Sequence, residues 1–325
     1  MCKALETRRS LKLQDTSSQT QFDHNTPDPG RPREIEERLN LYLIHPLSWR
    51  LVRVLLSTPI TPNAVSVSGA VMAFAAASCF YYLPWPMGAL AGFACMFLTH
   101  VLDGLDGRLA RVSGRGSANG EIIDGLCDHI GYTAVYCSMA LVLVRDIGQG
   151  PAWTFAILAG ISNILHASSY EYQRRTYNHH VYGRLWIRNK LGSKSDASKA
   201  EIEGSIFTLI GRFSLFIQGF VSAENPKVDE AMSHLTSQDT ETTEKARDIY
   251  RSFAIKQVRN WSVLGQNHKT LAIFLGMLAG NPVYFFIYVA TVLNVVLGIL
   301  IFRQHQINST ILARLSDFKP VERSA

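Results

Sequence analysis

The chain has 325 residues, of which 47% are hydrophobic and only 18% charged, with a formal net charge of +6 and a mean hydropathy of +0.06. Length alone would allow two soluble domains, but the apolar residues gather into blocks of about the length that spans a bilayer. This pattern excludes an ordinary soluble protein. Beside membrane segments, the basic balance favours anionic lipid as a partner and gives no reason to expect nucleic acid.

The five cysteines show neither a disulfide pattern nor a zinc pattern. None of them forms a CxxC pair, and four lie in or beside apolar blocks. We interpret them as reduced, buried, small hydrophobic residues. They are Cys2, Cys79, Cys95, Cys127 and Cys137.

The N-terminal part of the chain divides into two segments. Residues 1–32 are polar and end in a run rich in Pro and Gly, which predicts a disordered tail. Residues 33–62 mix charged with apolar residues and are interrupted by Pro46. This pattern predicts interfacial amphipathic helices with Trp49 and Arg50 at the headgroup level, and a buried soluble helix is the alternative.

Residues 63–303 contain six candidate membrane spans and predict an all-α integral membrane domain. The fifth candidate is short, so we expect its helix to begin near Val258 as an amphipathic segment. A polar cytoplasmic helical insert of about residues 170–268 separates the fourth span from the fifth. Its apolar run at 204–222 predicts a surface-lying or packed helix, and a seventh span is the alternative. Residues 304–325 form a C-terminal tail. The candidate spans are 64–83, 84–102, 122–144, 152–169, a segment ending near Asn281, and 282–302.

The distribution of Lys and Arg predicts the orientation of these spans. With the N-terminus inside and six spans, 31 of the 32 basic residues fall in inner segments, and only Arg145 lies in an outer loop. Because basic residues concentrate on the cytoplasmic side of membrane proteins, we expect a multi-pass protein with both termini facing the cytoplasm. The connection between the second and third spans would face the same side.

That connection carries four aspartates in two helical pairs. Asp103 and Asp106 are three residues apart, and Asp124 and Asp128 are four apart, so each pair shares a helix face. If the two helices pack side by side, the carboxylates converge at the cytoplasmic boundary. They would then need compensating cations, and hard oxygen ligands favour Mg²⁺ or Mn²⁺.

Small and basic residues lie among the aspartates. The small residues leave one side of the helix bare for a flat or bulky group, and the arginines would supply positive charge to a phosphate or a carboxylate. Ordinary ion pairing at a membrane surface is the alternative, but it explains neither the glycines nor the two helical spacings. The residues are Gly104, Gly107, Ala110, Arg108, Arg111 and Arg115.

Together these residues resemble the CDP-alcohol phosphotransferases (CDP-alcohol phosphatidyltransferases). The signature of that family is D-x2-D-G-x2-A-R, about eight residues, then G-x3-D-x3-D, and every fixed position is filled between Asp103 and Asp128. The "TPN" at residues 61–63 is also similar to the family. The resemblance covers about residues 35–170, and the long insert is an enlargement over the compact members.

The resemblance implies a six-helix membrane fold, a homodimer, and a polar cavity open to the cytoplasm. It implies that Asp103, Asp106 and Asp124 hold one or two divalent cations. Asp128 would border the same metal site and act as the general base for the acceptor hydroxyl. Residues that would border the nucleotide are Gly107, Ala110, Arg111 and Gly120.

The expected reaction is phosphatidyl transfer from CDP-diacylglycerol to the hydroxyl of a small polar acceptor, with release of CMP, in phospholipid biosynthesis. Transfer of a head group from CDP-choline or CDP-ethanolamine to a lipid alcohol uses the same motif and remains the alternative. Arg174 and Arg175 are candidates to bind an acceptor phosphate, although positive-inside anchoring also explains them. Asn163 and His166, inside the fourth span, should face the cavity or another helix. Other basic candidates are Arg212, Lys256, Arg259, His268 and Lys269.

Two other classes of protein fit the sequence less well. A membrane prenyltransferase also holds Mg²⁺-diphosphate on aspartates, but it splits its motifs between two distant loops, whereas this chain has one cluster. A cation transporter needs polar residues through the depth of the bilayer, whereas here they crowd the inner boundary. The sequence therefore favours a membrane-embedded transferase.

Overall fold

The computed structural model describes residues 32–117, 119–184, 223 and 225–318. All regular structure in these residues is helical, which confirms the predicted all-α class for this part of the chain. The tail predicted at 1–32, apart from its last residue, and the apolar run at 204–222 lie outside the described residues.

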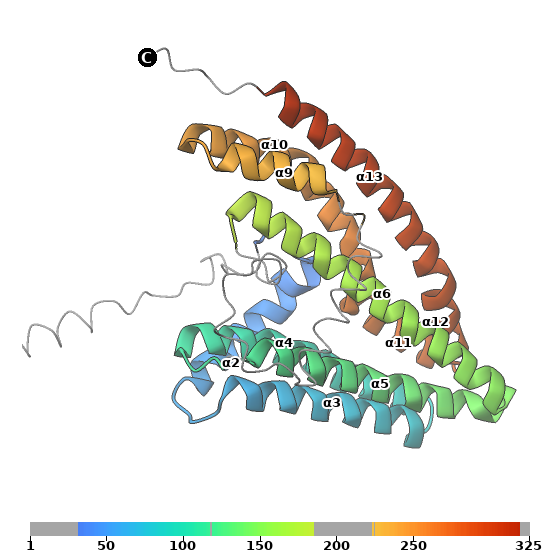
Figure 1. The fold of residues 1–325 in the computed structure, drawn as a ribbon. Helices are drawn as coiled ribbons and strands as arrows, with labels where there is room; N and C mark the ends of the chain where they lie inside the picture. The colour runs from blue at the N-terminus through green and yellow to red at the C-terminus, as the bar shows by residue number, and fades with distance from the viewer. Residues whose placement is uncertain (1–31, 118, 185–222, 224, 319–325) are drawn as a thin grey trace, which may run out of the picture. The chain divides into compact units, whose positions relative to one another are not determined.

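Among the described residues, the first half of the fold consists of five α-helices preceded by a π-helical turn (Figure 1). The turn η1 (Asn40–Ile44) leads directly into α2 (His45–Leu55). Three long helices, α3 (Pro62–Tyr82), α4 (Met87–Ser113) and α5 (Gly120–Ile147), then pack together, and α6 (Gln149–Tyr182) follows.

The second half begins with α9 (Pro226–Thr236) and α10 (Thr240–Trp261). A short 3₁₀ turn, η3 (Ser262–Leu264), precedes α11 (Gln266–Leu278). The last helix is continuous through α12 (Val283–Ile287), the π-turn η4 (Tyr288–Val292) and α13 (Leu293–Asp317).

Four helices in the described part of the chain are long and apolar enough to cross a membrane. They are α3, α4, the Ile122–Ile147 part of α5, and the continuous helix Val283–Asp317. The candidate fifth span corresponds to α11, whose 13 residues make a helix of about 20 Å, shorter than the roughly 30 Å hydrocarbon core. The structure therefore shows a helical protein with four candidate spans, and six spans stay a prediction.

Pro46 does not interrupt the N-terminal helix, contrary to the sequence interpretation. The N–H of His45 donates to the carbonyl of Asn40, five residues back, and Pro46 stands at the start of α2, where no N–H is required. Ile44, Ser48 and Val52 are buried, and α2 packs against α4. The outer face of the continuous segment formed by η1 and α2, with the residue before it, exposes large apolar side chains, as an interfacial helix would: Leu39, Tyr42, Leu43, Leu51 and Val54.

The expectation that a helix runs from near Val258 into the fifth span is also wrong. The chain leaves the helical conformation after Trp261 and passes through η3 to an extended Gly265. The carboxylate of Glu37 lies where a Cβ on Gly265 would stand, and it accepts a hydrogen bond from Asn267 at 2.6 Å. The N-terminal segment therefore packs directly against this helix break.

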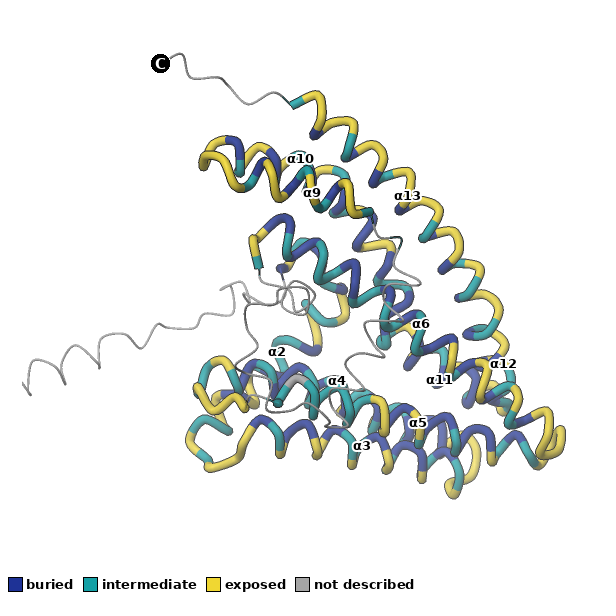
Figure 2. The backbone as a smooth tube through the Cα atoms, in the orientation of Figure 1, coloured by how far each residue is buried: buried dark blue, intermediate teal, exposed yellow. Residues whose placement is uncertain are grey.

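Small residues bring α3 into close contact with α4 and α5. A Cβ on Gly131 of α5 would stand 2.7 Å from the Cβ of Ala73, and one on Gly92 of α4 would overlap the ring of Phe80. Close approach through small residues is a common way for membrane helices to pack. Figure 2 shows buried residues where these helices meet and exposed residues along the outer edge of α13.

A second apolar core lies at the other end of α6. There α10 packs against the end of α6, α9 and the C-terminal half of α13, around residues such as Tyr177, Met232 and Ile311. The described part of the predicted insert therefore folds as helices on this core, and the helix α13 continues far beyond residue 303, where the tail was expected.

Candidate active site

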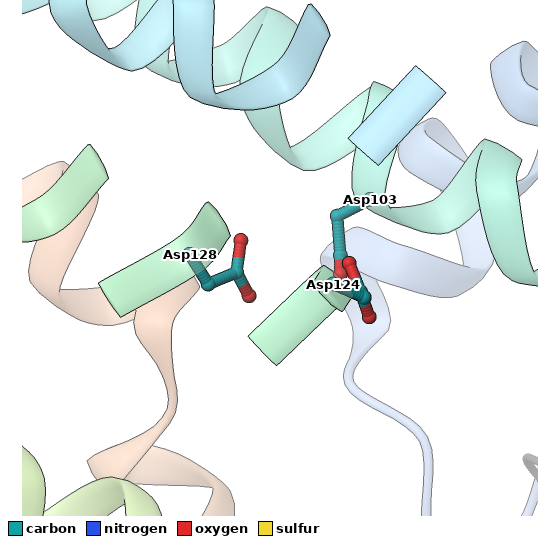
Figure 3. A group of neighbouring side chains, drawn as sticks. All are labelled: Asp103, Asp124 and Asp128. Atoms are coloured by element: carbon teal, nitrogen blue, oxygen red, sulfur yellow. The ribbon is translucent and has the colours of Figure 1, made fainter. Parts of the chain in front are cut away.

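Three aspartates from two helices meet at one point of the structure. Asp103 lies on α4, and Asp124 and Asp128 lie on successive turns of α5. Each is half-buried, and each offers a carboxylate oxygen within 4.8 Å of the others. Figure 3 shows the carboxylates of Asp103 and Asp124 together, with that of Asp128 approaching from the next turn. The two predicted pairs therefore converge.

The turn between α4 and α5 is held by the start of α3. Gly114 ends α4 with a φ of +66°, a left-handed conformation that suits glycine. Asn63 exchanges hydrogen bonds with Ser117 at 3.2 Å, and Arg115 Nη1 donates to the carbonyl of Thr58 at 2.7 Å. Thr61, the first residue of the "TPN" sequence, caps α3. These contacts fix where α5, with its two aspartates, begins.

Asp106 occupies a more buried position than the other three aspartates. Only 5% of it is exposed, and its carboxylate accepts hydrogen bonds from Ser66 Oγ and from the N–H of Gly107, both at 2.5 Å. It interacts electrostatically with Asp103 and lies beside Asp124. Asp106 therefore lies between the cluster and α3, next to the three aspartates that meet.

The two glycines of the motif have different surroundings. A Cβ on Gly104 would stand 2.9 Å from Arg108 Nη1 and 3.0 Å from Ser48 Oγ, so this glycine allows α2 to pack on α4. The interpretation of Gly104 as part of a bare, ligand-facing side is therefore wrong. A Cβ on Gly107 would meet only the guanidinium of Arg111, at 3.3 Å, so this glycine does leave open space.

The three arginines of the motif also have different surroundings. Arg108 is 2% exposed, donates to the carbonyl of Gly104 at 2.5 Å and lies 6.0 Å from the ring centre of Trp49, so it faces α2. Its predicted role as a phosphate-binding charge is not supported by this position. Arg115 is bonded to the loop before α3, whereas Arg111 is exposed beside Gly107.

The four residues predicted to border the nucleotide lie at the end of α4 and the start of α5. Gly107, Ala110 and Arg111 share the last turns of α4, and Gly120 is the first residue of α5. A Cβ on Gly120 would stand 3.2 Å from Ser117 Oγ and 3.5 Å from Asn63 Oδ1. These positions surround the turn that carries the aspartates.

Arg174 and Arg175 both pair with one carboxylate. Their guanidinium groups lie 2.7 Å and 2.6 Å from Glu171 on the same helix. Burial alone would raise the pKa of Glu171, but the two guanidinium groups outweigh that effect and lower its pKa to about 2. The carboxylate is therefore charged at neutral pH and partly neutralises both arginines.

Asn163 and His166 face other helices. Lys269 of α11 is fully buried and donates to Asn163 Oδ1 at 2.6 Å, and His166 Nε2 lies 3.0 Å from Asn294 Oδ1. This bears out the expectation that the two polar residues of the predicted fourth span face the cavity or another helix. Among the other basic candidates, Lys256, Arg259 and His268 are exposed, and Arg212 lies outside the described residues.

The donor set suits a divalent cation that prefers oxygen. Three half-buried carboxylates supply only oxygen atoms, and their convergence places several negative charges within a few ångströms. Mg²⁺ and Mn²⁺ take carboxylate ligands together with water or phosphate oxygens. The residues present therefore fit the metal that the sequence predicts.

Apolar helices and a carboxylate cluster at the end of two of them define a multi-pass membrane protein with a candidate metal site. In a comparison with known proteins, residues 59–210 match the CDP-alcohol phosphatidyltransferase family. The matched part is a little less than half of the chain and contains helices α3 to α6 and the aspartate cluster.

Its similar proteins include phosphatidylinositol phosphate synthases of mycobacteria. The protein of Mycobacterium tuberculosis (strain H37Rv) is 37% identical over 90 residues, which are 27% of this chain and 40% of that protein. The protein of Mycobacterium marinum is 39% identical over 87 residues, which are 26% of this chain and 36% of that protein. The chain thus matches about two fifths of the length of these relatives.

Proposed function

We propose that the protein transfers a phosphatidyl group from CDP-diacylglycerol to the hydroxyl of a small polar acceptor, releasing CMP, in phospholipid biosynthesis. The observation that carries this proposal is the convergence of Asp103, Asp124 and Asp128 inside the region that matches the family. The name of the mycobacterial relatives describes synthesis of a phosphatidyl lipid, which favours phosphatidyl transfer over transfer of a choline or ethanolamine head group.

Asp103, Asp106 and Asp124 would hold Mg²⁺ or Mn²⁺ against the diphosphate of the donor. When bound, such a cation would neutralise charge on the phosphoryl oxygens and on the departing CMP. The buried position of Asp106 and its bond to Ser66 support a role in orienting this group of carboxylates.

Asp128 would act as the general base while bordering the same cations. Its carboxylate approaches the cluster from a separate turn of α5, so one oxygen could face an incoming hydroxyl (Figure 3). It would accept the proton as the acceptor oxygen attacks the phosphorus that carries the diacylglycerol group. The bond from that phosphorus to CMP would break in the same displacement.

The remaining site residues would bind the two substrates. Gly107, Ala110, Arg111 and Gly120 would border the cytidine and its phosphate. Gly107 supports this assignment because the space beside it is open except for the side chain of Arg111. Arg174 and Arg175 would bind a phosphate on the acceptor. Both arginines would then contact this phosphate as well as the carboxylate of Glu171.

We further propose that the site and both chain ends face the cytoplasm and that the enzyme works as a homodimer. The distribution of Lys and Arg supports the orientation. A site at the membrane boundary would let the lipid donor keep its acyl chains in the bilayer, where the surrounding membrane lipids hold them, while its diphosphate reaches the aspartates.

Incubation of the purified protein in lipid vesicles with Mg²⁺, CDP-diacylglycerol and a panel of polar alcohols and their phosphates tests this proposal. A parallel panel offers CDP-choline and CDP-ethanolamine with diacylglycerol. We expect CMP release and a new phosphatidyl lipid only in the first panel.

Other outcomes would identify the alternatives. CMP release only in the second panel would assign head-group transfer. Release of inorganic diphosphate from a prenyl donor would assign a prenyltransferase. Cation flux into vesicles without any CMP would assign a transporter.

A further inference from the structure

A hydrogen-bonded triangle of side chains lies behind the aspartate cluster. The hydroxyl of Thr270 on α11 lies 2.8 Å from Nε2 of His100 on α4 and 3.2 Å from the hydroxyl of Tyr132 on α5. The Tyr132 hydroxyl also lies 3.4 Å from Nε2 of His100. The three polar groups therefore join three helices at one point.

The triangle is one helical turn from the aspartates on both helices that carry them. His100 precedes Asp103 by three residues, and Tyr132 follows Asp128 by four, so each pair shares a helix face. Tyr132 is close enough to both aspartates to interact with their charges. The triangle therefore connects α4 to α5 on the side of the cluster away from the α4–α5 turn.

The burial of this triangle makes its geometry rigid. Thr270 is 3% exposed and Tyr132 8%, so neither hydroxyl can readily exchange its partner for water. Hydrogen bonds in such surroundings are strong, and loss of one member removes a partner from each of the other two. The residue before Thr270, Lys269, also ties α11 to Asn163 of α6, so α11 is fixed from two sides.

We propose that His100, Thr270 and Tyr132 are positioning residues that set the spacing between α4 and α5, and thereby the distance between Asp103 and Asp128. This inference rests on the divalent-cation site of the proposed function. Mg²⁺ and similar cations demand near-ideal ligand geometry, so a small change in helix spacing weakens their binding.

Two tyrosines on α5 provide a matched test. Tyr132→Phe removes one hydroxyl from the triangle and keeps the ring. Tyr136→Phe makes the same change one turn further on, where the buried hydroxyl has no hydrogen-bond partner among the described residues. Titration of Mn²⁺ into the purified full-length protein, followed by electron paramagnetic resonance, measures cation affinity without turnover.

We expect Tyr132→Phe to weaken Mn²⁺ binding about tenfold, the lower end of the range for groups that support metal ligands, and Tyr136→Phe to leave it unchanged. Thr270→Val should weaken binding to a similar extent, whereas Thr270→Ser, which retains the hydroxyl, should restore most of the affinity.

Equal affinity in the wild type, Tyr132→Phe and Thr270→Val would overturn this inference alone and leave the metal site standing. Equal weakening by Tyr136→Phe would also overturn it, because the loss would then reflect general packing. A wild-type protein that binds no Mn²⁺ would overturn both the proposed metal site and this inference.

Discussion

The hydroxyl of Ser66 lies 2.5 Å from Oδ2 of Asp106, although the two residues are 40 positions apart in the chain. Ser66 is on α3, and Asp106 is on α4, where its carboxylate is almost fully buried. A buried carboxylate needs donors, and Ser66 supplies one of them. The first helix of the matched region therefore orients an aspartate of the site without contributing a charge itself.

Ser66→Ala should lower activity about tenfold, because Asp106 loses the donor that orients it. The stability of the protein should fall by about 1–3 kcal/mol, the cost of leaving a buried acceptor unsatisfied. Ser68→Ala is the control, since Ser68 is exposed and donates only to Ala64 of its own helix. Steady-state CMP release and thermal unfolding in detergent measure the two effects, and similar results for both variants would refute the role of Ser66.

Asp128→Asn should retain cation and CDP-alcohol binding and lose turnover by about 10²–10⁴-fold, because an amide cannot accept the acceptor's proton. The control is Asp146→Asn, which makes the same change at an exposed position near the other end of α5. Equilibrium binding and CMP release are measured on the same preparation. Full activity in Asp128→Asn would show that the base lies elsewhere.

Gly104→Ala should affect the stability of the protein, whereas Gly107→Ala should affect substrate binding. The new methyl group at Gly104 would press on Arg108 and Ser48, so we expect a stability loss of about 1–3 kcal/mol. At Gly107 only a flexible arginine is near, so thermal unfolding should change little while the KM for the CDP-alcohol rises. The reverse pattern would contradict the assignment of the two glycines.

Arg174→Gln and Arg175→Gln should each raise the KM for a phosphorylated acceptor about tenfold or more, the loss expected for a charge-assisted contact, and change the KM for the donor little. The double variant Glu171→Gln with Arg175→Gln distinguishes binding from anchoring. If the arginine serves only to pair with Glu171, removing both charges should restore the wild-type kinetics; if it binds the acceptor, the KM should stay high.

The aspartate cluster could be predicted from the sequence because it depends on local spacing. Residues three or four apart share a helix face, and the short connection between α4 and α5 keeps their adjoining ends close while both helices pack against α3. The same argument could not find Ser66 or Thr270, because their contacts to α4 cross 40 and 170 residues. No periodic pattern encodes such pairs.

Three of the sequence predictions were wrong because the packing partners of the residues are distant in the sequence or lie on other helices. Arg108 carries the positive charge expected of a phosphate ligand. However, Gly104 has no side chain, so α2 packs closely on α4 and buries Arg108. A proline usually interrupts a helix. Here the π-turn η1 comes directly before Pro46, so the missing N–H of Pro46 breaks no required hydrogen bond. The helix break at Gly265 packs against Glu37, which is distant in the sequence.

Calorimetric titration of CMP into the purified wild-type protein, with Mg²⁺ and then with EDTA, tests the central claim most directly. We predict that CMP binds only when Mg²⁺ is present and that Asp103→Asn and Asp124→Asn abolish this binding. Equal affinity for CMP with and without the cation would contradict a site in which carboxylates from α4 and α5 hold the nucleotide through a metal.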